Sequence, residues 1–257
     1  MTLEELLGGA PRIEKVAGGF QFTEGPVFSR RGYLLFSDIP AQRIMKWERG
    51  NVTVLREQSN RANGLTFDHQ GRLLACEAGR VTRTEKDGSI TVLASEGLQG
   101  PNDIVYAIDG SIYFSDLPRS RVYQITRKGE MRVVAQDCVG PNGVALSPNQ
   151  QKLYVADYRG KKIRVYDVAA DGALNNGRDF AAETGDGLKT DEAGNVWVAT
   201  GGEGVAVFDS SGQRLGLVKT PESPANLCWG EGFRGLYVTA RTSVYRVGTR
   251  VNGTRTY

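Results

Sequence analysis

The sequence predicts an all-β protein, a six-bladed β-propeller with four antiparallel strands in each blade. Two observations support this prediction. A unit of paired apolar runs recurs six times, and successive copies begin 39 to 44 residues apart. Turns that contain glycine separate the runs, and the 257 residues include 33 glycines. Short strands at this spacing are typical of propeller blades. We therefore expect residues 1–257 to form a single domain.

Each copy begins with a polar residue and continues into two short strands joined by a turn. The predicted pairs cover residues 24–28 and 33–38, 63–68 and 73–77, 102–106 and 112–116, 142–146 and 153–157, 186–190 and 196–199, and 226–229 and 236–239. Third runs follow, for example at 121–125 and 162–166, and most copies have a fourth, for example at 52–55 and 90–93. Alternating runs rich in Val, Ile and Tyr indicate strands.

The two ends of the chain predict how the ring closes. The sixth copy ends after its third run at 244–247, whereas the chain begins with an additional run at 12–16. We expect this N-terminal run to supply the outer strand of the last blade, because pairing there covers an exposed sheet edge. Residues 2–7, which precede it, form the one stretch with a helical pattern.

Composition excludes several classes of partner and compartment. The net charge is +3, and no Lys/Arg run is long enough to predict nucleic-acid binding. No apolar run approaches the length of a membrane span, and the N-terminus lacks the features of a secretory signal, so a cytoplasmic protein is expected. Cys76, Cys138 and Cys228 are odd in number and far apart, which predicts neither a disulfide framework nor a zinc site. These features do not predict an oligomeric state.

The residues that open the six copies form a predicted ring, because the first strand of each propeller blade lines the central channel. Every member carries a side-chain oxygen and two are acids: Glu24, Asn63, Asn102, Asn142, Asp186 and Asn226. Asn-Gly and Asp-Gly pairs are common in turns. These pairs, however, precede the inner strand, whereas the hairpin turns follow it. The alternative is that the ring amides only cap strand ends or hold waters in the channel.

A ring of oxygens with two carboxylates suits a hard divalent cation. Calcium accepts carboxylate and amide oxygens in flexible geometry, whereas zinc prefers His or Cys ligands. The single histidine, His69, lies in a hairpin turn away from the ring, so it cannot complete a Ser–His–Asp or Cys–His arrangement there. The donor set therefore favours one calcium ion, with zinc, magnesium and manganese as alternatives.

The segments around these positions resemble the family of senescence marker protein, gluconolactonase and luciferin-regenerating enzyme. The resemblance covers the chain from about Phe22 to Arg246 and is carried by Glu24-Gly25-Pro26, Pro101-Asn102-Asp103, Gly140-Pro141-Asn142-Gly143 and Gly185-Asp186-Gly187-Leu188. The gluconolactonase branch is the most similar, through residues 63–68, 74–77 and 224–230.

The resemblance implies a divalent metal held by Glu24, Asn142 and Asp186, with Asn102 as a fourth ligand or a substrate contact. It also implies that Asp186 is the catalytic acid/base. The chain departs from the gluconolactonase pattern around the channel mouth. The histidine and paired arginines that usually follow the Cys-Glu of the second blade are missing, the loop at 95–100 has no Lys or Arg, and the usual Pro-Pro-Tyr-like stretch is replaced by residues 117–120. Arg119 and Arg80 are the candidate substrate contacts that remain.

Three functions are compatible with this set of residues. The first is a metal-dependent hydrolase that opens a lactone, a sugar lactone if the gluconolactonase resemblance holds. In that reaction the metal polarises the carbonyl and a carboxylate assists the attacking water. The second is hydrolysis of a phosphoester or fluorophosphate at the same metal, as in the similar diisopropyl fluorophosphatase. The third is a non-catalytic propeller that binds a partner and uses the metal only for stability.

Overall fold

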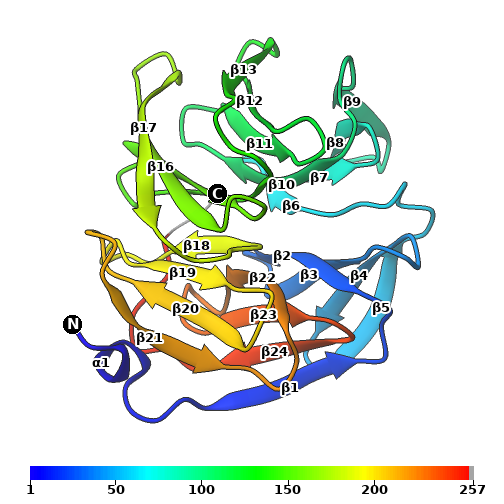
Figure 1. The fold of residues 1–257 in the computed structure, drawn as a ribbon. Helices are drawn as coiled ribbons and strands as arrows, with labels where there is room; N and C mark the ends of the chain where they lie inside the picture. Colours follow the sequence, from blue (N-terminus) through cyan, green and yellow to red (C-terminus); the bar gives the residue numbers. More distant parts are fainter. Residues whose placement is uncertain (255–257) are drawn as a thin grey trace.

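The computed structural model describes residues 1–254 and arranges them as six four-stranded antiparallel sheets around a central axis (Figure 1). The sheets follow one another in chain order, so each sheet is one blade (colours from blue to red in Figure 1). The predicted six-bladed β-propeller is confirmed.

Each blade consists of an inner, a second, a third and an outer strand. The inner strands are β2 (Thr23–Ser29), β6 (Leu65–Phe67), β10 (Pro101–Tyr106), β14 (Pro141–Leu146), β18 (Leu188–Thr190) and β22 (Pro224–Trp229). The second strands are β3 (Tyr33–Asp38), β7 (Leu73–Glu77), β11 (Ile112–Asp116), β15 (Lys152–Asp157), β19 (Val196–Ala199) and β23 (Leu236–Ala240).

The two remaining strands of each blade lie farther from the axis. The third strands are β4 (Arg43–Glu48), β8 (Arg80–Thr84), β12 (Arg121–Ile125), β16 (Lys162–Val168), β20 (Gly204–Phe208) and β24 (Ser243–Val247). The outer strands are β5 (Asn51–Arg56), β9 (Ile90–Ala94), β13 (Met131–Ala135), β17 (Leu174–Ala181), β21 (Arg214–Lys219) and, in the last blade, β1 (Ile13–Gly18).

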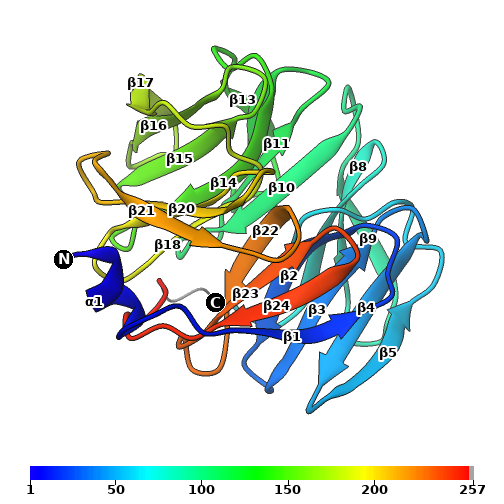
Figure 2. The same cartoon turned by 60° about the horizontal axis from the view of Figure 1, so that its bottom comes forward.

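The N-terminal strand closes the last blade, as the sequence predicts. β1 pairs antiparallel with β24, with Ile13 opposite Val247 and Gly18 opposite Ser243. Figure 2 shows the dark-blue β1 beside the red β24, so strands from the two ends of the chain share one sheet. The hydroxyl of Thr23, at the start of β2, donates to the Ser243 carbonyl at 3.0 Å and links the first blade to the last.

The predicted N-terminal helix is also present, as α1 (Leu3–Leu7). The Thr2 hydroxyl accepts a hydrogen bond from the Glu5 amide, and the Glu5 side chain accepts one from the Thr2 amide, so the helix begins with a capping box. Leu6 and Leu7 are buried in the core of the last two blades. Within residues 1–254, no helix has the length and hydrophobicity that crossing a bilayer requires.

The core lies mainly between the faces of neighbouring blades. Leu74 and Cys76 of the second blade pack in one cluster with Ile104 and Phe114 of the third. A strand that is covered on both faces in this way needs apolar side chains on both, which explains the nearly continuous burial of the inner and second strands. Cys228 is buried as well, so both cysteines of predicted strands are core residues.

Glu222 strengthens the blade that closes the ring. It lies in the loop before β22 and accepts hydrogen bonds from the Ser243 hydroxyl at 2.5 Å, the Tyr245 hydroxyl at 2.8 Å and the Thr242 amide at 2.9 Å. Lys15 of β1 is 3.9 Å away. Burial alone would raise the pKa of the Glu222 carboxyl, but the hydrogen bonds from Ser243, Thr242 and Tyr245 outweigh it and lower the pKa to about 2.

A lowered pKa makes part of the folding stability depend on pH. The contribution of Glu222 is complete above the ordinary carboxyl value of 4.5 and is lost as pH falls toward 2. We expect Glu222→Gln to lower the free energy of unfolding at pH 7 by about 2 kcal/mol, after allowance for partial solvent exposure. Urea unfolding between pH 7 and pH 3 should show the difference from wild type shrinking with acid. Glu203→Gln, in an exposed turn, is the control, and a pH-independent difference would contradict this role for Glu222.

Candidate metal centre and active site

The beginnings of the inner strands lie close together, and this brings the predicted ring residues to one end of the channel. The Gly64 amide donates to the Asn102 carbonyl of the next blade at 2.8 Å, and the Gly143 amide donates to the Asp186 carbonyl at 2.9 Å. A Cβ added to Gly143 would lie 2.8 Å from the Cα of Gly187. The glycine that follows these ring residues is therefore required by the approach of neighbouring strands, and not by a turn.

Buried aspartates hold the loops that lead into three of the ring positions. Each aspartate ends a second strand, and each accepts a hydrogen bond from the backbone amide two residues before a ring side chain. The three pairs are Asp38 with Phe22 at 3.0 Å, Asp116 with Gly100 at 3.1 Å, and Asp157 with Gly140 at 2.7 Å. These carboxylates thereby set the positions of Glu24, Asn102 and Asn142.

Three ring amides have side-chain oxygens that are buried without a hydrogen-bond partner among residues 1–254. They belong to Asn63, Asn102 and Asn142. The Asn142 amide group donates to the Asp186 carboxylate, so its unpartnered oxygen lies beside a ring acid. A buried oxygen without a donor is unfavourable by about 1–3 kcal/mol, and one bound cation would satisfy all three oxygens together.

The fourth ring asparagine has a different role. The Asn226 side-chain oxygen accepts the Leu227 amide at 2.8 Å, and its amide nitrogen donates to Glu24 Oε2 at 3.0 Å. The Gly25 amide also donates to that carboxylate oxygen. Asn226 is therefore a positioning residue for Glu24, whereas Asn63, which the sequence placed only in the ring, has an oxygen available as a ligand.

The ring acids are destabilised in their ionised form. Burial raises the pKa of Glu24 to about 7, and the nearby Asp103 carboxylate adds to the shift. Burial also raises the pKa of Asp186 well above its ordinary value, followed by repulsion from Glu24 and then from Asp103. A cation bound between these acids would relieve the burial penalty and the repulsion together.

The donor chemistry of the ring fits a hard divalent cation. Among the residues that the structure describes, no three His, Cys, Asp or Glu side chains converge closely enough to hold an ion by themselves. A site here needs amide oxygens together with the carboxylates of Glu24 and Asp186, and three such oxygens are present without other partners. Oxygen donors of mixed type are the ligands that calcium accepts most readily.

Two charged residues next to the ring were missed from the sequence. Asp103 is 2% exposed, and its Oδ2 accepts the Val144 amide at 3.0 Å. The Lys189 ammonium lies 3.6 Å from that carboxylate and donates to the Leu188 carbonyl. The repeat itself contained the signal for Asp103, because four of the other copies have glycine at the position after the ring residue.

The two candidate substrate arginines are differently placed. Arg80 begins β8 and its Nε donates to Glu77 at 2.8 Å, so an ion pair within its own blade holds this side chain. Arg119 lies in the turn between β11 and β12, and its side chain is exposed. Both follow the end of a second strand, which places them at the same end of the propeller as the ring. His69 lies at the opposite end, in the hairpin between β6 and β7.

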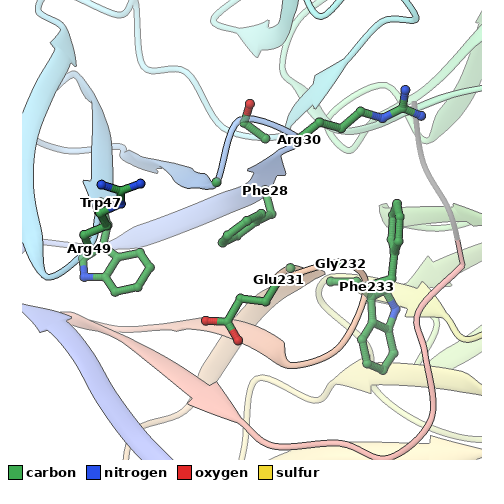
Figure 3. A pocket seen from close by; sticks show the side chains of 11 residues that line it. Phe28, Arg30, Trp47, Arg49, Glu231, Gly232 and Phe233 are labelled. Carbon is green, nitrogen blue, oxygen red and sulfur yellow. The ribbon is translucent and has the colours of Figure 1, made fainter.

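A pocket of about 570 Å³ lies at the opposite end of the channel, between the first and last blades. Figure 3 shows Phe28, Trp47 and Phe233 around it, with the carboxylate of Glu231 at its side. That carboxylate accepts a hydrogen bond from the Tyr237 hydroxyl at 2.8 Å. Phe28 lies near the end of β2, whereas Glu24 lies near its start. No ring residue lines the pocket, so the pocket is separate from the candidate metal centre.

The fold and the sequence together place this chain in a known class of propeller proteins. The sequence model of the SMP-30/Gluconolactonase/LRE-like region matches residues 22–242. The chain belongs to this family, and the resemblance seen in its sequence is confirmed.

Individual relatives cover nearly the whole chain. A gluconolactonase from Zymomonas mobilis is 28% identical in an alignment of 303 positions that covers 98% of this chain and 85% of the relative. A pentonolactonase from Haloferax volcanii is 25% identical and covers 84% of this chain and 80% of its own length. A solved gluconolactonase from Xanthomonas campestris superposes with a TM-score of 0.89 at 31% identity, covering 96% of this chain and 92% of the other.

The loop-holding aspartates can be tested at Asp157, which is fully buried and accepts the amides of Val139, Gly140 and Gly160. Asp157→Asn removes the charge and one acceptor oxygen, so we expect a loss of about 2–3 kcal/mol in the free energy of unfolding. Calcium affinity should also fall, because Asn142 is then less well held. Urea unfolding and calcium titration measure the two effects.

Asp109→Asn, in a hairpin at the other end of the propeller, is the control. Unchanged calcium affinity would show that Asp157 does not position the ring.

Proposed function

We propose that the protein is a divalent-metal-dependent lactonase that opens the ring of a sugar lactone at the channel end marked by Glu24 and Asp186. The observation that carries this proposal is the set of buried, unpartnered amide oxygens of Asn63, Asn102 and Asn142 beside two carboxylates. The substrate class is supported by the family and by two relatives named as a gluconolactonase and a pentonolactonase.

The proposed ligands are Glu24, Asn142 and Asp186, with Asn102 and Asn63 supplying further amide oxygens. When bound, the cation supplies a Lewis acid that polarises the lactone carbonyl and stabilises negative charge on its oxygen. Asn226 holds Glu24 in place through its amide group. Calcium is the proposed ion, because all of these donors are oxygens.

Asp186 is the proposed general base. It accepts a proton from a water molecule as the water oxygen bonds to the lactone carbonyl carbon. The bond between that carbon and the ring oxygen then breaks, and the proton held by Asp186 passes to the departing ring oxygen. The product is the open hydroxy acid. Arg119, exposed at the same end, is the proposed contact for substrate hydroxyl groups, and Arg80 is the second candidate because Glu77 already engages it.

Two substitutions separate base catalysis from metal binding. Asp186→Asn keeps one oxygen for the ion but cannot accept the proton, so turnover should fall by about 100- to 10,000-fold and stay low at saturating calcium. Glu24→Gln should chiefly weaken calcium binding, and its turnover should recover with excess metal. Lactone hydrolysis measured against calcium concentration tests both, with Asp87→Asn in an exposed hairpin as the control.

The same assays can also contradict each part of the proposed function. Recovery of Asp186→Asn to near wild-type turnover at saturating calcium would remove Asp186 as the base. A wild-type protein that cleaves a phosphotriester faster than an aldonolactone would overturn the proposed substrate class. Full activity after removal of divalent ions by a chelator would overturn the metal requirement.

A further inference from the structure

Asp103 connects two neighbouring blades by hydrogen bonds next to the candidate metal centre. Its backbone amide donates to the Ser115 hydroxyl at 3.1 Å, and its carboxylate accepts the Val144 amide of the next blade at 3.0 Å. Val144 lies two residues after Asn142, so this hydrogen bond helps to hold a candidate ligand in place. Asp103 therefore brings a third buried carboxylate close to the ring without belonging to the proposed ligand set.

That third carboxylate changes the charge at the site. Asp103 interacts electrostatically with both Glu24 and Asp186. With all three ionised, the carboxylates carry three negative charges, which exceeds the charge of one divalent cation. The structure places the Lys189 ammonium 3.6 Å from Asp103, and the same ammonium also interacts with Glu24. Its side chain is 18% exposed, so water screens these interactions only partly.

We propose that Lys189 makes the metal centre selective for a divalent over a trivalent ion. Its positive charge cancels that of Asp103 and leaves the two negative charges of Glu24 and Asp186. This inference rests on the proposed metal-dependent function. A divalent ion then makes the cluster neutral, whereas a trivalent ion leaves it with an excess positive charge inside the protein. A charge left uncompensated in a buried site is unfavourable. Lys189 is thus a specificity-determining residue that does not touch the ion.

The experiment compares the affinities for calcium and for a trivalent ion of similar size, terbium. Lys189→Met leaves three carboxylates without a counter-ion, so the ratio of terbium affinity to calcium affinity should rise by roughly tenfold or more. Lys189→Arg keeps the charge and should leave the ratio unchanged. Asp103→Asn should shift the ratio toward calcium, because only one net negative charge remains.

The double variant Lys189→Met with Asp103→Asn is the decisive arm. It removes one charge of each sign and restores two net negative charges, so its ratio should return to the wild-type value. Lys128→Met, on an exposed turn, is the control for loss of a surface charge. Affinities are measured by calorimetry at one pH and one ionic strength, after circular dichroism has confirmed that each variant is folded.

The outcomes distinguish this inference from the function on which it rests. If wild type binds neither ion, the proposed metal centre fails and the inference fails with it. If wild type binds calcium but Lys189→Met keeps the wild-type ratio, the inference alone is overturned, and the Lys189–Asp103 pair serves only the fold. If Lys189→Met does not fold, the Asp103→Asn and double variants decide, and equal ratios in those two would overturn the proposal.

Discussion

The candidate site depends on the backbone hydrogen bonds that join the beginnings of neighbouring inner strands. The Gly64 amide reaches the Asn102 carbonyl, and the Gly143 amide reaches the Asp186 carbonyl. Strands this close leave no room for a Cβ at Gly64 or Gly143, yet they bring side chains from separate blades together, such as Asn226 and Glu24. The close approach of the inner strands forms the channel and also brings the oxygens of the ring together.

A repeated fold acquires an asymmetric site through small differences between its copies. The aspartates that hold the incoming loops occur in the first, third and fourth blades, where they position Glu24, Asn102 and Asn142. The fifth blade ends its second strand at Ala199 and has no such carboxylate there. In the second blade the corresponding residue is Glu77, which binds Arg80 and the Thr82 hydroxyl of its own sheet.

The sequence was sufficient for the fold and for the ring, because both follow from periodicity. The repeated unit shows the order of the strands, the closure of the ring by the N-terminal strand, and which residue of each copy lies at the channel. Periodicity could not separate the roles of the ring asparagines, since Asn63 and Asn226 are the same residue in the same phase. Their difference arises from hydrogen-bond partners in three dimensions, such as the Leu227 amide that occupies the Asn226 oxygen. Periodicity also gives no weight to Asp103, because this residue stands at a position where the copies differ and not at one that they share.

Closure by β1 also has a consequence for how the chain acquires its structure during translation. Among the described strands, β1 leaves the ribosome first and its partner β24 leaves last. Throughout synthesis the nascent chain therefore carries an unpaired N-terminal strand, while its growing end exposes the face of the newest blade. Such edges can pair with those of other unfinished chains. The ring is protected from this only when its final blade receives strands from both ends.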